Sequence, residues 1–349
     1  MVTQSDVAKK AGVSFITVSR VLNNKSYVKK ETKEKVLKAI KELNYYTNHI
    51  GQALRKNRVN TIGIVIPEPP NVPVHGMAYY NMLMQGIDKF TIAHGYDILL
   101  STYKQDNPKV DYCRLYFQRK VDGLIFFIPD MRYLNVSQIV KKNIPCVIVG
   151  ERPNNTNISY VDADNFNGMY RMTEYLISKG ARNIVFLKGK SYMQNSIDRI
   201  NGFLKAMEKN KIRVLDDNIF EGDYTIDSGI TVMKKIITSG KLPDAIICSN
   251  DLMAIGVLSE AKKVNIKVPE DMSLVGFDDI NITALVDPPL ATVRQPLFDM
   301  GYKASEILYN KILDKKYPSE KKIFPIELII RKSIANKHKR STGLEKILC

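Results

Sequence analysis

The sequence has no long hydrophobic run, and this absence excludes whole classes of protein. Its longest useful apolar stretch is GLIFFIP, residues 123–129, in a chain of 349 residues. A membrane-spanning helix needs about 18 apolar residues in succession, so we expect none here. The first ten residues, MVTQSDVAKK, are polar and include an acid, unlike the apolar centre of a signal peptide. We therefore predict a cytoplasmic protein.

Cysteine and histidine are both scarce, and neither is grouped. The four cysteines form no CxxC pair, which favours free thiols in a reducing compartment. No histidine is paired with Cys or Asp at the spacing of metal ligands. The residues concerned are Cys113, Cys146, Cys248, Cys349, His49, His75, His94 and His338.

The short motifs of common enzymes are missing as well. Gly189-Lys190-Ser191 resembles the end of a phosphate-binding loop, but Ile184 stands where a Walker A motif requires glycine. No GxGxxG follows a predicted strand, and there is no GxSxG. Asp278 and Asp279 are adjacent, so their side chains diverge rather than converge on one substrate atom. We predict no catalytic residue, no cofactor and no metal, and hence a protein that is not an enzyme.

Positive charge is abundant, and it is concentrated at the two ends. Residues 1–60 hold 13 Lys/Arg and 4 Asp/Glu, a net charge of +9, and residues 331–349 hold 6 and 1, a net charge of +5. The whole chain carries +16, which leaves only +2 for the middle. A basic block at the N-terminus suits a phosphate backbone as partner, although a solvated basic face would look the same by composition alone.

The N-terminal block has the pattern of three short helices. Thr3 and Asp6 have the spacing of a capping box, which predicts a helix that begins just after Thr3, and Gly12 is a natural end for it. Ser14 can cap a second helix that runs to residue 22, and residues 30–43 show helical spacing of apolar positions. Together these predict a helix-turn-helix unit. The positions expected to face inward are Val7, Ala8, Ala11, Val18, Val21, Leu22, Val36, Leu37, Ile40 and Leu43.

The second of these helices leaves Phe15, Ile16, Thr17, Ser19 and Arg20 on its outer side. A recognition helix must present side chains to the DNA major groove while its other face packs against the core of its own domain. Arg20 can pair with guanine through two hydrogen bonds, whereas Phe15 and Ile16 can only contact thymine methyl groups. A helical bundle that binds no nucleic acid is the alternative, and exposed apolar residues beside an arginine argue against it.

The segment DVAKKAGVSFITVSRVLNNKSYVKKETKEKVLKAIKELNYYTNHIGQAL resembles the DNA-binding headpiece of the lactose-repressor (LacI/GalR) family almost position for position. The run V-A-x-x-A-G-V-S-x-x-T-V-S-R-V-L-N is highly specific to that family. The resemblance implies a double-stranded operator as partner, with Phe15, Ile16 and Arg20 reading base edges. Further DNA contacts are expected from Ser14, Thr17, Ser19, Asn23, Asn48, Gly51 and Leu54.

Members of this family have a second DNA-binding element after the headpiece, a hinge segment that becomes helical only on operator DNA. Asn48 matches the cap of that hinge, and Leu54 matches the leucine that wedges between base pairs in the minor groove. Gly51 stands where alanine is common, and Thr47 where proline is usual. Both differences raise the conformational entropy of the free hinge, so we expect a larger ordering cost on binding.

After residue 60, short apolar runs alternate with helical stretches such as 77–94 and 107–119. This repetition predicts α/β architecture, with parallel sheets covered by helices and about ten strands split between two lobes. The motifs EGDYTIDSG, ICSNDLMAIG, VPEDMSLVGFDDI and PPLATVRQP resemble the family's core, which implies a two-lobed type I periplasmic-binding-protein-like fold. The expected boundaries are a headpiece over 1–47, a hinge over 48–60, a core over 61–333 and a disordered basic tail over 334–349. Within the core we expect lobe 1 over about 61–158 and 290–320, and lobe 2 over about 159–289 and 321–333.

Ligands of such sheets bind beyond the carboxyl ends of the strands. By position in the family motifs, the resemblance places Arg199, Asn250 and Asp278 at a small-molecule effector, with Tyr224 stacking on it. A carboxylate, a guanidinium and an amide suit a polyol. Two structural alternatives stay open, since Asn250 can instead cap the helix that follows it and Tyr224 can be plain cleft wall.

The effector contacts of the first lobe are less defined. Tyr79, Tyr80 and Glu68 flank a proline-rich loop and are candidates to touch a sugar ring, but the tyrosines can equally pack helix 77–94 onto the sheet. Gly150 stands where many sugar-binding relatives have Asp, and Glu151 or Arg152 are candidates to replace that contact.

The function predicted from these features is a repressor that acts as a homodimer on a pseudo-palindromic operator. Its dimer contacts are expected from lobe 1, including helix 77–94, and the tail lacks the heptads of a tetramerising coiled coil. The effector is expected to be a sugar or sugar derivative, with a nucleobase or a phosphoprotein as alternatives. A solute-binding protein without DNA function is a more distant reading, which the headpiece opposes.

Overall fold

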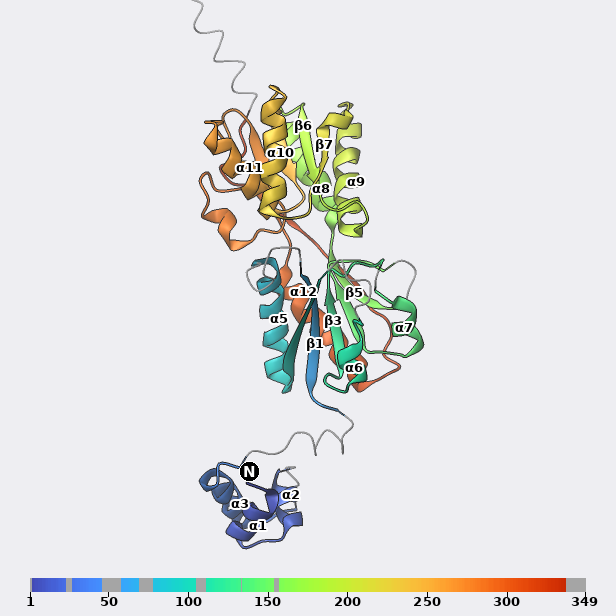
Figure 1. The fold of residues 1–349 in the computed structure, drawn as a ribbon, viewed down its shortest axis with the longest axis vertical. Helices are drawn as coiled ribbons and strands as arrows, with labels where there is room; N and C mark the ends of the chain where they lie inside the picture. The colour runs from blue at the N-terminus through green and yellow to red at the C-terminus, as the bar shows by residue number, and fades with distance from the viewer. Residues whose placement is uncertain are drawn as a thin grey trace, which may run out of the picture. The chain divides into compact units, whose positions relative to one another are not determined.

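We describe a computed structural model of the protein, covering residues 2–22, 27–45, 58–68, 78–104, 111–132, 134–153 and 157–336. The chain divides into two compact units, Met1–Val59 and Asn60–Cys349. Their helices and strands can be followed in Figure 1. Asn23, the predicted hinge residues Thr47, Asn48, Gly51 and Leu54, and residues 337–349 of the predicted tail lie outside the described residues.

The first unit contains the three predicted helices, α1 (Gln4–Ala11), α2 (Phe15–Leu22) and α3 (Lys30–Glu42). The capping box is present, because Thr3 N donates to Asp6 Oδ2 at 2.8 Å and Asp6 N donates to Thr3 Oγ1 at 3.3 Å. Gly12 ends α1 in the left-handed region at φ 66°, a conformation that glycine adopts without a steric cost. Ser14 caps α2 by accepting a hydrogen bond from Thr17 N at 3.1 Å.

A small apolar core joins these helices. Its buried members are Val7, Ala8, Val18, Val21, Val36 and Ala39. The prediction that Leu37 faces inward was wrong, because this side chain is 48% exposed and Ala39 is buried in its place. Positions 36 and 39 are three apart and so share the face of α3 that meets α1 and α2, whereas position 37 is turned by about 100° away from 36.

The first sheet of the second unit has six parallel strands in the order β11-β5-β4-β3-β1-β2. Its strands are β1 (Thr61–Glu68), β2 (Asp97–Lys104), β3 (Gly123–Phe127), β4 (Cys146–Val149), β5 (Ser159–Ala163) and β11 (Lys321–Phe324). Side chains alternate between its faces: Ile125 and Phe127 join the cluster that includes α5 (Ala78–His94) and α12 (Leu297–Leu313), whereas Leu124 and Phe126 face α6 (Arg114–Phe117) and α7 (Val136–Lys141). The helix expected over 107–119 is described only from residue 111 and is α-helical over α6.

The second sheet has four parallel strands in the order β7-β6-β8-β9. They are β6 (Ile184–Lys188), β7 (Ile219–Glu221), β8 (Ala245–Cys248) and β9 (Ser273–Val275). Two helix pairs accompany them, α8 (Asn165–Ser178) with α9 (Gln194–Lys209), and α10 (Ile226–Thr238) with α11 (Asp251–Lys263). Two short 3-10 helices, η2 (Asp216–Asn218) and η3 (Asn281–Ala284), complete this lobe. The predicted two-lobed parallel α/β core is thus confirmed.

The predicted boundaries inside the core need two corrections. Strands β5 and β11, assigned above to lobe 2, pair with each other and belong to the first sheet, since β5 also pairs with β4. The core also extends past residue 333, because Ala335 N donates to Ser273 Oγ at 3.0 Å. Both errors have one cause: local pattern identifies a strand but not the neighbour that it hydrogen-bonds.

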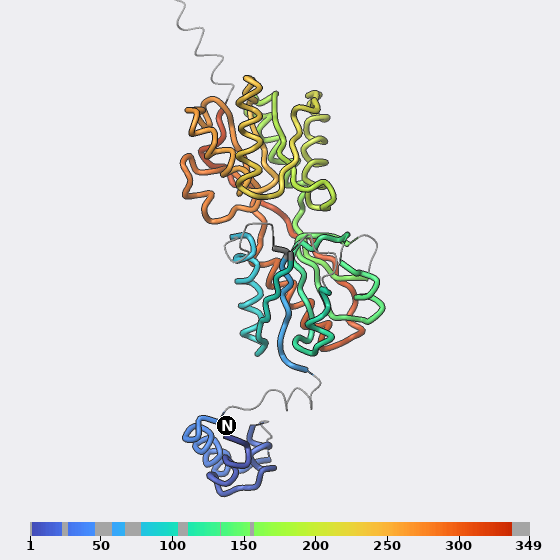
Figure 2. Tube along the Cα trace, in the orientation of Figure 1, coloured from blue at the N-terminus to red at the C-terminus, as the bar shows by residue number. Residues whose placement is uncertain are grey.

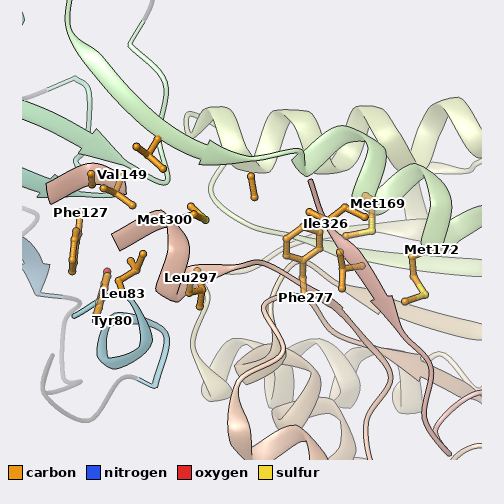
Figure 3. Packing of buried hydrophobic residues seen from close by; sticks show 14 of the residues in the cluster. Tyr80, Leu83, Phe127, Val149, Met169, Met172, Phe277, Leu297, Met300 and Ile326 are labelled. Carbon is orange, nitrogen blue, oxygen red and sulfur yellow. The ribbon is translucent and has the colours of Figure 1, made fainter. Parts of the chain in front are cut away.

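The chain crosses between the lobes three times, after β5, before α12 and after β11, as the trace in Figure 2 shows. Two of these crossings pair as a small antiparallel sheet of β10 (Thr292–Arg294) and β12 (Glu327–Ile329). The apolar core does not stop there: Figure 3 shows buried side chains that continue from Phe127 and Leu83 through Leu297 to Phe277 and Met169. The carboxyl ends of both sheets therefore meet across a packed connection.

Candidate functional sites

The outer face of α2 is apolar and basic, as the sequence predicts. Phe15 and Ile16 are 50% and 60% exposed although both are large apolar side chains. Arg20 is exposed, and its guanidinium lies 5.3 Å from the centre of the Tyr27 ring. Because the other face of α2 supplies Val18 and Val21 to the core, these three side chains are presented to solvent together.

The polar residues of α2 are partly engaged within the headpiece. Ser14 and Thr17 hydrogen-bond through their hydroxyls at 2.9 Å, in addition to the cap made by Ser14. Ser19 is half-buried. A free helix face that presents apolar groups and an arginine, on a unit with a net charge of +9, is the arrangement that major-groove reading requires.

In the second unit, Arg199, a predicted effector contact, is buried. Its Nε donates to Asn165 Oδ1 at 2.8 Å and its Nη1 donates to the carbonyl of Ser249. The guanidinium also lies 3.8 Å from the centre of the Phe277 ring, a cation–π arrangement. The side chain is thereby held flat, with its donors fixed in direction.

Asp278 follows β9 and is 5% exposed. Gln295 Nε2 donates to its Oδ1 at 2.7 Å. Burial raises the pKa of Asp278 to about 7, against the opposing influence of Arg199 and this hydrogen bond. The negative charge of this carboxyl group is therefore poorly solvated, and its role toward a ligand stays a prediction.

The backbone at Asp278 is strained, and its neighbour holds it there. Asp278 and Asp279 have φ values of 120° and 60°, in the region that L-residues rarely adopt. Asp279 accepts from Arg294 Nε at 2.7 Å and from Arg331 Nη2 at 2.7 Å. Since both arginines belong to the segments that connect the lobes, this turn is fixed by the connection itself.

Asn250 and Tyr224 are joined to each other. Asn250 caps α11 by accepting from Met253 N at 3.0 Å, and its amide donates to the Tyr224 carbonyl at 3.0 Å. Tyr224 has φ 68°, and its hydroxyl donates to Asn195 Oδ1 at 2.7 Å. A Cβ on Gly189 would lie 2.0 Å from the Tyr224 ring, so only glycine allows the ring its place. The capping alternative for Asn250 is thus present in the structure.

The effector contacts predicted in the first lobe have different environments. Tyr80 is buried and stacks on Phe127 with 5.8 Å between ring centres, so it packs α5 onto the sheet. Tyr79 is half-buried, and a Cβ on Gly150 would lie 3.0 Å from its hydroxyl oxygen. Burial and the nearby Asp278 carboxylate raise the pKa of Tyr79. Tyr79 therefore lies near Gly150 and Asp278, whereas the side chain of Glu68 lies outside the described part of the chain.

Arg152 lies at the cleft but is engaged by two acids. Its Nε is 3.3 Å from Asp162 Oδ2, and its Nη2 pairs with Asp198. The neighbouring Glu151, 2% exposed, accepts from Gln194 N at 3.0 and 3.2 Å. Four buried polar residues near these candidates were not predicted from the sequence: Asp162, Asn165, Asn195 and Gln295. Asp162 lies at the carboxyl end of β5, where the position of ligand sites in parallel sheets could have indicated it. The roles of the effector-site residues stay predictions.

No helix among the described residues is both long and apolar enough to cross a membrane. In the same part of the chain, no three His, Cys, Asp or Glu side chains are grouped to hold a metal ion.

A helix-turn-helix unit followed by a two-lobed α/β core with a polar cleft defines a DNA-binding regulator that carries a ligand-binding domain. Residues 3–48 match the family described as bacterial regulatory proteins, lacI family, and residues 173–334 match a periplasmic binding protein-like domain. The HTH-type transcriptional repressor PurR of Vibrio cholerae serotype O1 (strain M66-2) is 33% identical over 338 residues, which cover 96% of this chain and 98% of its own. PurR of Haemophilus influenzae is 34% identical over 342 residues, covering 96% and 99%. The chain therefore belongs to the lacI family, which confirms the resemblance.

Solved structures agree. The lac repressor dimer bound to operator and the anti-inducer ONPF has a TM-score of 0.85 and 26% identity, covering 96% of this chain and 99% of that one. A complex of the transcriptional regulator CelR with cellobiose has a TM-score of 0.73 and 27% identity, covering 95% and 100%.

Proposed function

We propose that this protein is a cytoplasmic transcriptional repressor that binds a pseudo-palindromic operator as a homodimer. Its operator affinity is set by a small-molecule effector, a sugar or sugar derivative, held between the two lobes of the core. The observation that carries the proposal is the exposed α2 face of Phe15, Ile16 and Arg20 on a family headpiece.

The reading roles follow from the chemistry of this face. Arg20 supplies the donors that match guanine O6 and N7, and the two apolar side chains suit thymine methyl groups. Ser14, Thr17 and Ser19 stand beside them to contact the phosphate backbone. We also assign DNA contacts to Asn23, and to Asn48, Gly51 and Leu54 of the predicted hinge, on the family resemblance.

The cleft supports a polyol as effector. Asp278 offers a desolvated acceptor, and Arg199 offers fixed donors directly across from aromatic surface. Tyr224 and Tyr79 border the same space and supply the ring faces on which a pyranose stacks. CelR in its cellobiose complex, a similar structure at 27% identity, is compatible with a carbohydrate, and the PurR relatives at 33% and 34% identity are compatible with the nucleobase alternative.

A homodimer is supported by apolar side chains left in solvent. Ile92 on α5 is 71% exposed, and Leu285 just after η3 is 81% exposed. Single exposed apolar side chains are also normal on monomers, so the stronger support is the similar structure of the lac repressor dimer, with a TM-score of 0.85. A two-fold dimer presents two headpieces, so its operator has two related half-sites.

Effector binding changes operator affinity only by the difference in its affinity for the two lobe arrangements. In the proposed mechanism, a change in that arrangement alters the spacing of the two predicted hinges. Paired hinge segments then form or lose their DNA contacts, and operator affinity follows.

The experiment that tests the function is selection of genomic DNA fragments by the purified protein at physiological salt, followed by sequencing. We expect enrichment of one pseudo-palindrome, with the half-site spacing of a dimer. The matched control is Arg20→Ala, which should enrich a motif degenerate at one position of each half-site. Absence of any enriched motif, with and without a metabolite extract, would contradict the proposal, and a tetramer in light scattering would contradict the dimer.

A further inference from the structure

The N-terminus of α9 is occupied by a carboxylate of the opposite lobe. Glu151 follows β4 of the first sheet, and both of its oxygens accept from Gln194 N, the first residue of α9. Arg152 N adds a third donor at 3.2 Å. Helix N-termini attract anions because their N–H groups are unpaired and the helix dipole is positive there. Glu151 thus holds the position that a phosphate or carboxylate of a ligand would need.

The two arginines of the cleft are also engaged by the chain itself. Arg152 is paired with Asp162 and Asp198. Arg199 is bonded to Asn165 and to the Ser249 carbonyl, and it is stacked on Phe277. Arg152 is therefore paired with two acids, and Arg199 already uses Nε and Nη1 on the chain itself, which leaves each guanidinium fewer donors for an anionic group.

The cleft retains acceptors instead. Asp162 is 1% exposed, and its Oδ2 has no hydrogen-bond donor within the described part of the chain, although Arg152 lies near. Glu151 and Asp278 are two further buried carboxyl groups among the residues near Arg152 and Arg199. Burial raises the pKa of Glu151 and Asp162 to about 7 and about 6, because a negative charge is costly where water is excluded. These carboxyl groups would repel an anionic ligand, whereas hydroxyl and ammonium groups of a ligand would donate hydrogen bonds to them.

We infer that the effector carries no negative charge: it is a neutral or aminated sugar rather than a sugar phosphate or sugar acid, and Glu151 enforces this choice by closing the anion site at α9. This inference rests on the proposed effector function of the cleft. It makes Glu151 a specificity-determining residue that acts by exclusion.

The first test needs no knowledge of the effector. Thermal unfolding of the core transition is followed for the full chain in phosphate and in chloride of equal ionic strength. We expect phosphate to raise the unfolding temperature of Glu151→Ala. The wild type and the control Glu208→Gln, which changes an exposed glutamate on the same helix, should respond to phosphate equally and less than Glu151→Ala. Equal phosphate responses of Glu151→Ala and wild type would overturn the inference. Glu151→Gln keeps the shape without the charge, so it should bind phosphate less than the alanine variant does.

The second test uses the effector in a metabolite extract. The extract is passed over an anion-exchange resin, and both fractions are assayed for a change in operator binding. The inference expects the activity in the unretained fraction, and activity in the retained, anionic fraction would overturn it. If the whole extract has no effect, effector control itself fails, and the phosphate comparison still decides whether Glu151 closes an anion site.

Discussion

Arg20 is the α2 side chain with the donors that base-specific hydrogen bonding needs. In the protein alone it is exposed and rests beside the exposed Tyr27 ring, so it can turn toward DNA without breaking a core contact. In the role proposed for them, the neighbouring Phe15 and Ile16 contact bases only through shape and thymine methyl groups.

Arg20→Ala should therefore cost about 1–3 kcal/mol on the preferred operator and relax base choice at one position per half-site. Binding to a set of operators, each varied at one base pair, measures this by fluorescence anisotropy. Lys38→Ala, an exposed basic residue on α3, serves as a charge-matched control that should keep the base preference. A uniform loss over all sequences for Arg20→Ala would mean that the arginine binds phosphate only.

Glu151 also gives the core a pH-dependent stability. Burial raises its pKa from 4.5 to about 7, so the folded protein binds this proton where the unfolded chain has already released it. The contribution to stability is complete below about pH 4.5 and is lost as the pH rises through 7. The shift corresponds to roughly 3 kcal/mol.

The free energy of unfolding of Glu151→Gln, relative to wild type, should accordingly rise between pH 5 and pH 8. Urea unfolding of the core at several pH values measures the difference. Glu208→Gln should show no such trend over this range, because its carboxylate is exposed and hydrogen-bonded to Lys205, which lowers its pKa. A flat difference for Glu151→Gln would show that this carboxylate is better solvated than its burial indicates.

At the scale of elements, the helix pairs are closely packed through glycine. On α5, a Cβ at Gly86 would lie 1.9 Å from the Phe298 carbonyl oxygen, and on α12 a Cβ at Gly301 would lie 2.1 Å from the Leu83 carbonyl oxygen. The same kind of contact joins α10 to α11 at Gly229 and Gly256. Because the obstructing atoms are backbone, they cannot move aside as a flexible side chain would.

Gly86→Ala and Gly301→Ala should each destabilise the core by about 1–3 kcal/mol, despite the better helix propensity of alanine. The double variant should cost less than the sum, since one substitution already separates the helices for the other. Chemical denaturation measures all three, with the exposed Gln85→Ala on α5 as the control for propensity. Neutral single variants would show that α5 and α12 can slide apart freely.

At the scale of the whole molecule, the proposed effector site and the proposed DNA-reading face belong to different units of the chain. The headpiece has its own core, and Asp278 is buried in the second unit. Damage to the cleft should therefore separate the response from the binding.

Asp278→Ala should leave operator binding in place and abolish the effector response. Asp278→Asn should weaken the response less, because it retains one acceptor and the approximate volume. Operator titrations with and without the metabolite extract measure both. A variant that loses operator binding while remaining folded would place Asp278 in the coupling between units rather than at the effector.

The sequence by itself determined the helix-turn-helix unit, its caps at Thr3 and Ser14, and the outer face of α2. Each of these depends on residues three or four positions apart, where helix geometry alone fixes which side chains meet. The β-α alternation of the core was equally local, and so was the placement of Asp278 and Tyr224 after strands.

Only the tertiary structure decided which strands are neighbours and which charges are paired. Local pattern could not place β5 and β11 side by side, because they are joined through hydrogen bonds between distant segments. For the same reason the sequence offered Arg152 as an effector contact, whereas folding brings Asp162 and Asp198 to it from two other elements. A buried charge is stabilised by an oppositely charged partner that the tertiary structure brings near it, and that partner has no fixed spacing in the sequence.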